Sequence, residues 1–285
     1  MNVADAMTPR EALVTVSVPG TRDDALTYLQ EREFSSIPVV KGEGSNEEFR
    51  GLVSRQTLIE HPDEDQLALL VEDGPTTTAD TTIEAVAREM VTTGARRVPV
   101  VNEHLNGIIT ITDVVRAIAE GDAAGDVPVG DLATKSVNAV YVDAPLTVAE
   151  RELSHSGVPY AVVLDDDGEM CGMLTEPDIL AVAQVVEGEA QTGDSIAGQD
   201  DDWMWEGIKA VGNRYFPTRN VEIPADPVRE FMTADVVSVG TTRPARETAQ
   251  EMITNDIEQI PLVGGSDLIG IVRDIDLLGA LDVEE

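Results

Sequence analysis

The chain has 285 residues, of which 42% are hydrophobic and 26% charged, a balance typical of a folded protein and too apolar for a disordered one. Its single cysteine, Cys171, excludes an intramolecular disulfide framework and any cysteine-rich zinc or iron–sulfur site. With 54 acidic and 19 basic residues the formal net charge is −35, which leaves no basic face for nucleic acid or an anionic membrane.

The acidic residues are spread along the whole chain, and lysine is reduced to Lys41, Lys135 and Lys209. This composition predicts a halophilic protein, because at molar ionic strength charge repulsion is screened within about 3 Å. The alternative is an acidic protein of an ordinary cytosol. No apolar run approaches the ~20 residues that span a bilayer, and the first residues lack the regions of a signal peptide, so we expect a cytoplasmic location without membrane contact.

The first part of the chain, copy one (residues 1–62), sets a plan that recurs along the sequence. The apolar run Ile37–Val40 contains a proline and predicts a buried strand. An acidic, glycine-containing stretch then predicts a hairpin, and a second apolar run begins at Gly51. The apolar runs are continuous rather than alternating, which is typical of strands in a sheet covered on both faces.

Copy two (residues 63–123) repeats this plan with a clearer helix in front of the proline strand. Residues 81–95 place four apolar side chains on one helical face: Ile83, Val86, Ala87 and Met90. The strand Val98–Val101 follows, and its partner strand begins at Gly107. The pattern of each copy is therefore strand, helix, strand, hairpin, strand and helix.

Copy three (residues 126–186) has its apolar runs at Val158–Val163 and from Gly172. The interval from Thr147 to Pro159 is shorter than the interval from Thr81 to Pro99 in copy two. The helix of copy three is therefore expected to be more than one turn shorter, which reshapes its pocket.

An insertion, residues 187–227, separates copy three from copy four (residues 228–285), whose helix pattern covers 243–257. The insertion contains Trp203 and Trp205, and two interpretations remain open. Either a helix in the insertion packs back over its own pair of copies, or its aromatic side chains form a docking face for another chain.

The most specific mark of the repeat is Gly-apolar-x-Thr-x-x-Asp, at the last strand and the following helix. Two copies match it fully, copy two with Gly107, Thr110 and Asp113, and copy three with Gly172, Thr175 and Asp178. Copy one has Ser54 followed by Thr57, and copy four has Arg273 followed by Asp276.

This plan resembles the CBS domain (cystathionine-β-synthase domain), present four times in tandem. The resemblance implies an α/β (α+β) fold of four strand–helix–strand–strand–helix units, paired into two Bateman modules. Copies one and two are expected to form one module, and copies three and four the other. The arrangement is similar to that of the gamma subunits of AMP-activated protein kinase and of stand-alone archaeal proteins in the family.

The Thr-x-x-Asp spacing suits a nucleotide on chemical grounds. A threonine hydroxyl and the first amides of a helix can hold a phosphate, and a carboxylate three residues later can accept both ribose hydroxyls. The same spacing is also a good N-terminal cap, so a purely structural role is the alternative.

The resemblance assigns these roles residue by residue. Ribose binding falls to Asp113, Asp178 and Asp276, and phosphate binding to Thr110, Thr175 and Ser54. The backbone of the proline strands is assigned to adenine: Ile37 and Pro38, Val98 and Pro99, Val158 and Pro159, and Ile260 and Pro261.

Arginines add a second signal in copies two and four. Arg96 and Arg97 precede the proline strand of copy two and can neutralise a phosphate; the alternative is an exposed ion pair with Glu89 or Glu120. Arg273 either reaches a phosphate or fills an empty site with its own charge.

The favoured function is therefore a non-catalytic sensor of AMP, ADP or ATP, with NAD or S-adenosylmethionine as alternative ligands, that regulates an unidentified protein. A homodimer is one assembly to test. The competing hypothesis is an interaction protein with degenerate sites. The repeats leave no room for a catalytic barrel of ~250 residues, so we do not expect an enzyme or a metal site.

Overall fold

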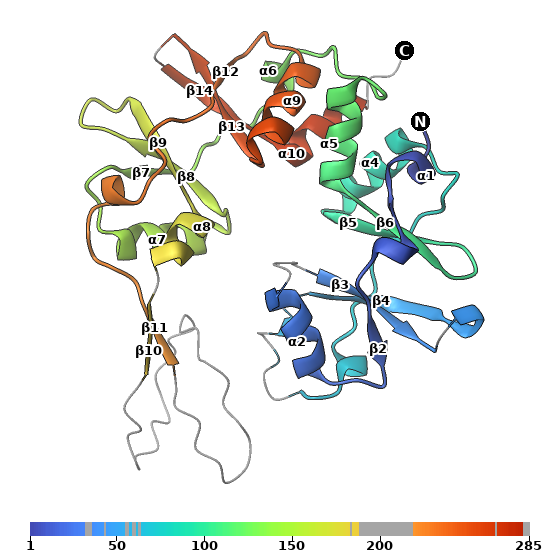
Figure 1. The fold of residues 1–285 in the computed structure, drawn as a ribbon. Helices are drawn as coiled ribbons and strands as arrows, with labels where there is room; N and C mark the ends of the chain where they lie inside the picture. The colour runs from blue at the N-terminus through green and yellow to red at the C-terminus, as the bar shows by residue number, and fades with distance from the viewer. Residues whose placement is uncertain are drawn as a thin grey trace. The chain divides into compact units, whose positions relative to one another are not determined.

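The computed structural model describes residues 1–31, 36–42, 44–54, 57, 58, 61, 64–182, 184–187, 219–265 and 267–281 (Figure 1). The chain divides into two compact units. Unit 1 comprises Met1–Thr134, Ser238–Leu262 and Gly270–Glu285, and unit 2 comprises Lys135–Val237 and Val263–Ile269. Unit 1 therefore holds copies one and two, the start of copy three and most of copy four, and unit 2 holds the rest of copy three.

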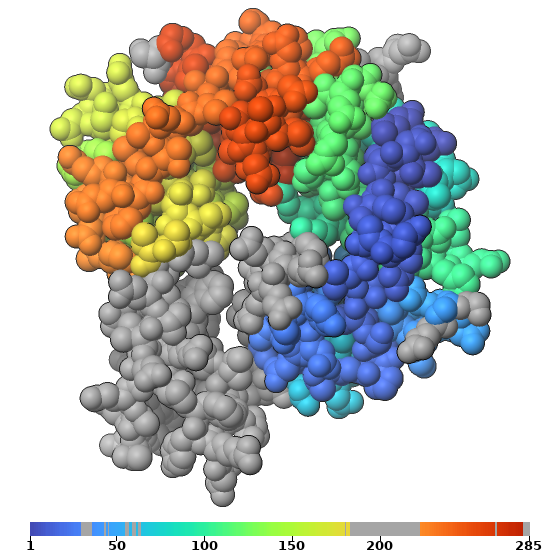
Figure 2. Space-filling model, in the orientation of Figure 1, coloured from blue at the N-terminus to red at the C-terminus, as the bar shows by residue number. Residues whose placement is uncertain are grey.

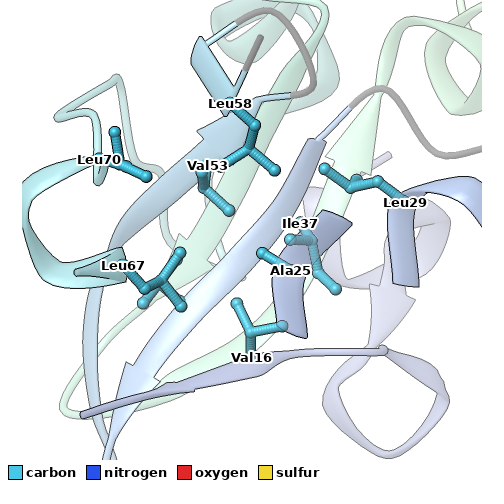
Figure 3. Packing of buried hydrophobic residues seen from close by; sticks show 9 residues of the cluster. Val16, Ala25, Leu29, Ile37, Val53, Leu58, Leu67 and Leu70 are labelled. Atoms are coloured by element: carbon cyan, nitrogen blue, oxygen red, sulfur yellow. The ribbon is translucent and has the colours of Figure 1, made fainter. Parts of the chain in front are cut away.

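Copy one contains β2 (Val16–Val18), α2 (Arg22–Glu31), β3 (Ser36–Lys41) and β4 (Glu48–Ser54). Strand β3 is central, parallel to β2 and antiparallel to β4. Buried side chains from α2 and all three strands meet on one face of this sheet, among them Ala25, Leu29, Ile37 and Val53 (Figure 3). The continuous apolar runs are thus explained by burial, as the sequence predicted. Short 3-10 turns lie at Gly44–Asn46 and Leu67–Leu69.

Copy two contains α4 (Ile83–Thr93), β5 (Arg97–Val101), β6 (Leu105–Thr110) and α5 (Ile111–Glu120). Thr82 caps α4 by accepting the amide of Ala85, and the helix ends at Gly94, whose φ of 73° is the left-handed conformation that glycine adopts without strain. The predicted apolar stripe is confirmed, because all four of its side chains are buried in the core.

Copy three contains β7 (Ala139–Tyr141), α7 (Leu146–Ser156), β8 (Tyr160–Leu164), β9 (Met170–Thr175) and α8 (Glu176–Val182). The prediction of a shortened helix is wrong: α7 and α4 both have 11 residues. The two prolines used to align the copies are not equivalent. Thr175 lies opposite Tyr160 where Thr110 lies opposite Arg97, so Pro159 occupies the position of Arg96 and precedes the strand.

Copy four contains β12 (Val239–Gly240), α9 (Ala245–Asn255), β13 (Gln259–Gly264), β14 (Asp267–Arg273), α10 (Asp274–Leu277) and the 3-10 turn η5 (Leu278–Leu281). Before it lie the short turn η4 (Val228–Glu230) and the ends of the insertion, β10 (Gln184–Glu187) and β11 (Arg219–Glu222), which pair antiparallel. The predicted roles of Trp203 and Trp205 concern positions outside the described residues.

Each sheet is completed by a short leading segment of another copy, which crosses over and pairs with it. The chain starts with α1 (Val3–Ala6), β1 (Thr8–Pro9) and a 3-10 turn (Arg10–Ala12), and β1 pairs with β6 of copy two. All four pairings use the same register position: Thr8 beside Ile108, Glu72 beside Leu52, Thr134 beside Ile271 and Thr233 beside Met173. Each copy is thus completed by the first residues of its sister copy, which pairs copy one with copy two and copy three with copy four.

These crossing segments explain the glycine at the head of the motif. A Cβ on Gly107 would stand 2.5 Å from the carbonyl oxygen of Thr8, and one on Gly51 2.5 Å from that of Glu72. At Gly172 it would meet Met232 at 2.6 Å. A side chain at this position would push the crossing segment off the sheet.

Within unit 1, copy four contacts copy two through helices. Helix α5 packs against α9 and α10, and α4 packs against η5. The surfaces of α5 and α9 meet in the space-filling view, where α5 is green and α9 orange (Figure 2). The short helix α6 (Val129–Leu132), at the start of copy three, lies in the same unit.

Candidate functional site

The motif of copy two lies at the junction between β6 and α5. Thr110 ends the strand and caps the helix, and its hydroxyl accepts the amide of Asp113 at 3.3 Å. In return Asp113 Oδ2 accepts the amide of Thr110 at 2.9 Å and its hydroxyl at 2.7 Å. The Thr-x-x-Asp spacing therefore does form a helix cap, the structural role that the sequence left open.

The other oxygen of Asp113 has a cationic neighbour that the sequence analysis missed. Arg116, one turn further along α5, donates to Asp113 Oδ1 at 3.2 Å. The Asp113 side chain is 12% exposed and that of Arg116 46% exposed. A carboxylate oxygen can accept more than one hydrogen bond, so capping leaves this group able to accept a sugar hydroxyl.

Arg96 and Arg97 reach the same junction from the neighbouring strand. Arg97 lies opposite Thr110 in the β5–β6 ladder, and the carbonyl of Arg96 accepts the first amide of α5, that of Ile111, at 3.0 Å. Burial and the charge of Arg96 both lower the pKa of Arg97, although Glu258 partly offsets them. The structure thus gathers the predicted arginines, Thr110 and Asp113 at one helix start.

The Arg96 guanidinium has partners that the sequence did not suggest. It donates to Asp274 at 2.5 and 3.2 Å and lies 3.2 Å from Glu258, both in copy four, rather than to Glu89 or Glu120. Burial lowers the pKa of Arg96, but the bonds to Asp274 and Glu258 outweigh this and raise it. Arg116, Glu258 and Asp274 also line a cavity of about 110 Å³ between copies two and four.

Copy three repeats the motif without the arginines. Asp178 Oδ2 accepts the amide of Thr175 at 2.8 Å and its hydroxyl at 2.6 Å, as in copy two. Pro159 and Tyr160 stand where copy two has Arg96 and Arg97, and Ala181 stands where it has Arg116. At these three equivalent positions copy three therefore lacks the cationic groups that copy two carries.

In copy four an arginine covers the carboxylate of the motif. Arg273 donates to both oxygens of Asp276, from Nε at 2.9 Å and from NH2 at 2.7 Å. The same two residues line a cavity of about 390 Å³ together with Asp131 of α6. Of the two roles left open for Arg273, the conformation matches the one in which its charge fills the site.

Copy one carries hydroxyls where the others carry the aspartate. Ser54 Oγ lies 2.6 Å from Thr57 Oγ1 and accepts the amide of Thr57 at 3.0 Å. The Thr57 hydroxyl also donates to Glu72, a residue of the crossing segment that the sequence analysis did not select.

The proline strands lie in the sheets beside these motifs. Ile37 and Pro38 are opposite Val53 and Leu52, as Val98 and Pro99 are opposite Ile109 and Ile108. Ile37, Val98 and Ile260 are fully buried, so their side chains serve the core. The carbonyl of Pro99 accepts the amide of Thr77 at 2.9 Å, so this backbone group is already in use.

Other chemistry finds little support in the part of the chain that the structure describes. Among those residues no group of three His, Cys, Asp or Glu side chains is placed to hold a metal ion. Burial raises the pKa of the Cys171 thiol, which opposes a role as a nucleophile. None of the described helices is long and apolar enough to cross a membrane.

The family follows from comparison with known proteins. The CBS domain profile matches four stretches, residues 3–64, 70–120, 129–184 and 228–283. The chain belongs to the CBS-domain family. The four matched stretches each contain one copy of the motif, and the mixed α/β units of the structure have the CBS fold. CBS domains are in general regulatory, ligand-binding domains rather than catalytic ones.

Individual relatives extend over nearly the whole chain. It is 25% identical to the uncharacterized protein MJ1404 of Methanocaldococcus jannaschii over 97% of its own length and 61% of that protein, so it spans about three fifths of this relative. A crystal structure of an uncharacterized conserved protein from Pyrococcus horikoshii aligns over 99% of this chain and 100% of that one, with a TM-score of 0.70 and 26% identity.

A second solved CBS protein shares the fold alone. MJ1225 from Methanocaldococcus jannaschii, proposed as an archaeal homologue of g-AMPK, aligns over 98% of this chain and 99% of its own, with a TM-score of 0.64 and 19% identity. Four CBS domains in one chain, with archaeal relatives, are therefore confirmed as predicted.

Proposed function

We propose that the protein is a non-catalytic regulatory subunit or switch that binds an adenine nucleotide, AMP, ADP or ATP, with NAD and S-adenosylmethionine as alternative ligands. One observation carries the proposal: copies two and three of a CBS protein hold the same Thr–Asp pair, with the same hydrogen bonds, at a strand–helix junction. A hydroxyl and a carboxylate at a helix start suit the phosphate and the ribose of a nucleotide.

Copy two is the favoured binding site. Arg97 lies opposite Thr110, and Arg116 contacts Asp113, so cationic groups flank the motif in a chain with a net charge of −35. A nucleotide phosphate bound elsewhere on this acidic surface would be repelled. Arg97, Thr110 and the first turn of α5 would hold the phosphate, and Asp113 would hold the ribose.

The proposal includes a regulated protein partner that responds to ligand occupancy, in a salt-rich cytoplasm. Neither nucleic acid nor a membrane surface fits the charge of the chain. A homodimer is the simplest assembly through which ligand binding in two chains is coupled.

A second candidate function is an interaction protein whose sites no longer bind ligands. Two contacts favour it: the Arg96 guanidinium is bonded to Asp274, and that of Arg273 is bonded to Asp276. Each contact uses a charge that a phosphate would need. The two functions differ in whether the purified chain binds nucleotide at all.

The decisive experiment is calorimetric titration of the full chain with AMP, ADP, ATP, NAD and S-adenosylmethionine in molar KCl. Asp113→Ala should weaken nucleotide binding by about 10-fold to 100-fold, since a hydrogen bond to a charged group contributes about 1.5–3 kcal/mol. Asp167→Ala, which removes one exposed carboxylate outside the motifs, is the matched control. Unchanged affinity with a lower melting temperature would show that Asp113 serves only as a cap.

A further inference from the structure

In copy one the carboxylate and the hydroxyl have swapped places between the last position of the motif and the crossing segment. At the last position of the motif the other copies carry Asp113, Asp178 and Asp276, but copy one carries Thr57. At the register position of the crossing segment the other copies receive Thr8, Thr233 and Thr134, but copy one receives Glu72. The one copy that lost its aspartate is the one whose crossing segment brings a glutamate.

The Glu72 backbone is fixed on the sheet of copy one. Its amide and carbonyl exchange hydrogen bonds with Leu52 at 2.8 and 3.1 Å, and a Cβ on Gly51 would collide with its carbonyl oxygen. The position of Glu72 is therefore set by strand pairing and does not depend on its side chain.

The Glu72 side chain reaches the motif. Its carboxylate accepts the hydroxyl of Thr57, which in turn lies 2.6 Å from the hydroxyl of Ser54. Carboxylate and hydroxyls thus meet at the start of the helix that follows β4, as Asp113 and Thr110 meet at the start of α5. The two groups are the same as in copy two, with the carboxylate supplied from the opposite strand.

Satisfying Thr57 does not by itself account for a carboxylate here. The Thr57 side chain is in contact with Ser54 Oγ, which can serve as its hydrogen-bond partner. Glu72 is an exposed residue, and the hydroxyl of Thr57 uses only one of its two carboxylate oxygens. A charge held against a buried threonine yet open to solvent suits ligand recognition.

We propose that copy one is a ligand site in which Glu72 accepts the vicinal hydroxyls of a ribose, the role given to Asp113 in copy two. The inference rests on the proposed function, because it deepens that function by adding a site whose motif lacks the aspartate. It also makes the site composite: Ser54 and Thr57 belong to copy one, whereas Glu72 belongs to the first residues of copy two.

The test uses the full chain with the three motif aspartates removed, Asp113→Ala, Asp178→Ala and Asp276→Ala together, so that copy one alone retains a carboxylate. AMP and 2′-deoxy-AMP are titrated into this parent, after circular dichroism shows that it is folded. The parent should prefer AMP by about 10-fold, the scale of one charge-assisted hydrogen bond. Glu72→Gln, which keeps the shape of the side chain, should abolish that preference, whereas the neighbouring carboxylate variant Asp73→Asn should retain it.

A rescue variant separates recognition from a structural role. Glu72→Thr combined with Thr57→Asp gives copy one the pattern of copies two and three and should restore the preference for AMP. If Glu72→Gln weakens both nucleotides equally, or leaves both unchanged, the role of Glu72 in ribose recognition is overturned. If the wild-type chain binds no nucleotide, the proposed function itself fails; if the wild type binds and only the parent does not, the Glu72 site alone fails.

Discussion

Copies two and four share a frame and differ in the residue that faces the carboxylate. Their first helices both have 11 residues, and their motifs both begin a helix with an aspartate that accepts the amide three residues before it, at 2.9 Å. In copy two a threonine hydroxyl contacts that aspartate; in copy four a guanidinium covers both of its oxygens. The backbone geometry of the motif is thus the same in both copies, while the side chain at the threonine position of the motif differs.

The two copies also differ where they touch. Arg96 and Glu258 hold equivalent positions, because the carbonyl of each accepts the first amide of the helix after the motif strand. One is positive, the other negative, and they lie 3.2 Å apart. Copies two and four share one residue pattern, yet at their contact the equivalent positions carry opposite charges.

Salt concentration should have the largest effect on stability, and it acts on copies two and four alike. The melting temperature should rise by roughly 10 °C or more from about 0.1 to about 1 M KCl, because the Debye length falls from about 10 to about 3 Å and the repulsion within a chain of −35 charge is screened. The motif ion pairs are partly exposed, at 46% for Arg116 and 41% for Arg273, so screening them costs little. Thermal denaturation measures the result, and a melting temperature that falls with salt would show that local ion pairs outweigh the repulsion.

Replacing Arg273 by threonine should make the motif of copy four resemble that of copy two. Arg273→Thr removes the guanidinium from Asp276 and should strengthen nucleotide binding at copy four by about tenfold, which is about 1.4 kcal/mol. Calorimetry in the Asp113→Ala, Asp178→Ala and Glu72→Gln background isolates this site. Arg50→Thr removes a comparably exposed arginine outside the motifs and should leave affinity unchanged. Weaker binding by Arg273→Thr would mean that Arg273 contacts the phosphate.

The smallest effect concerns the ends of the first helices. In copy two α4 ends at Gly94 with φ 73°, whereas in copy four α9 ends at Asp256 with φ 53°. This left-handed conformation is unfavourable for any residue that has a Cβ, so it destabilises the fold more with aspartate than with glycine. Asp256→Gly should stabilise the protein by about 0.5–1 kcal/mol, since it also removes a negative charge from a helix C-terminus. The reciprocal Gly94→Asp should destabilise it by a similar amount. Urea denaturation compares the two, and no gain from Asp256→Gly would indicate that its carboxylate makes a compensating contact.

Local patterns predicted most of the repeat. Apolar runs, hairpin signals and the stripe of α4 depend on neighbouring residues, so each is visible in the sequence, and Thr110 and Asp113 lie on one helix turn. The error over α7 arose from treating Pro159 as the strand proline. The better guide was the glycine that ends the helix, since Gly157 and Gly94 both adopt the left-handed conformation.

Contacts between distant segments could not be predicted from local patterns. The pairing of Arg96 with Asp274 and of Glu72 with Thr57 depends on how segments cross, which spacing does not reveal. A weak signal was present: Thr8, Thr134 and Thr233 lie near the starts of copies one, three and four, and Glu72 lies near the start of copy two. Their equivalence becomes visible only when the sheet registers are known.

The crossing segments bear on how this protein is synthesised and how it can be divided. Thr8 is synthesised long before its partner Ile108. Thr134 is likewise synthesised long before its partner Ile271, and the insertion is made between the two. The first pair of copies can therefore close once residue 108 has been made, whereas the second pair cannot close before residue 271 has been made. A fragment that stops at residue 64, where the family match to copy one ends, lacks Glu72 and leaves the edge of β4 bare. The smallest piece that retains its own sheets is a pair of copies together with both leading segments.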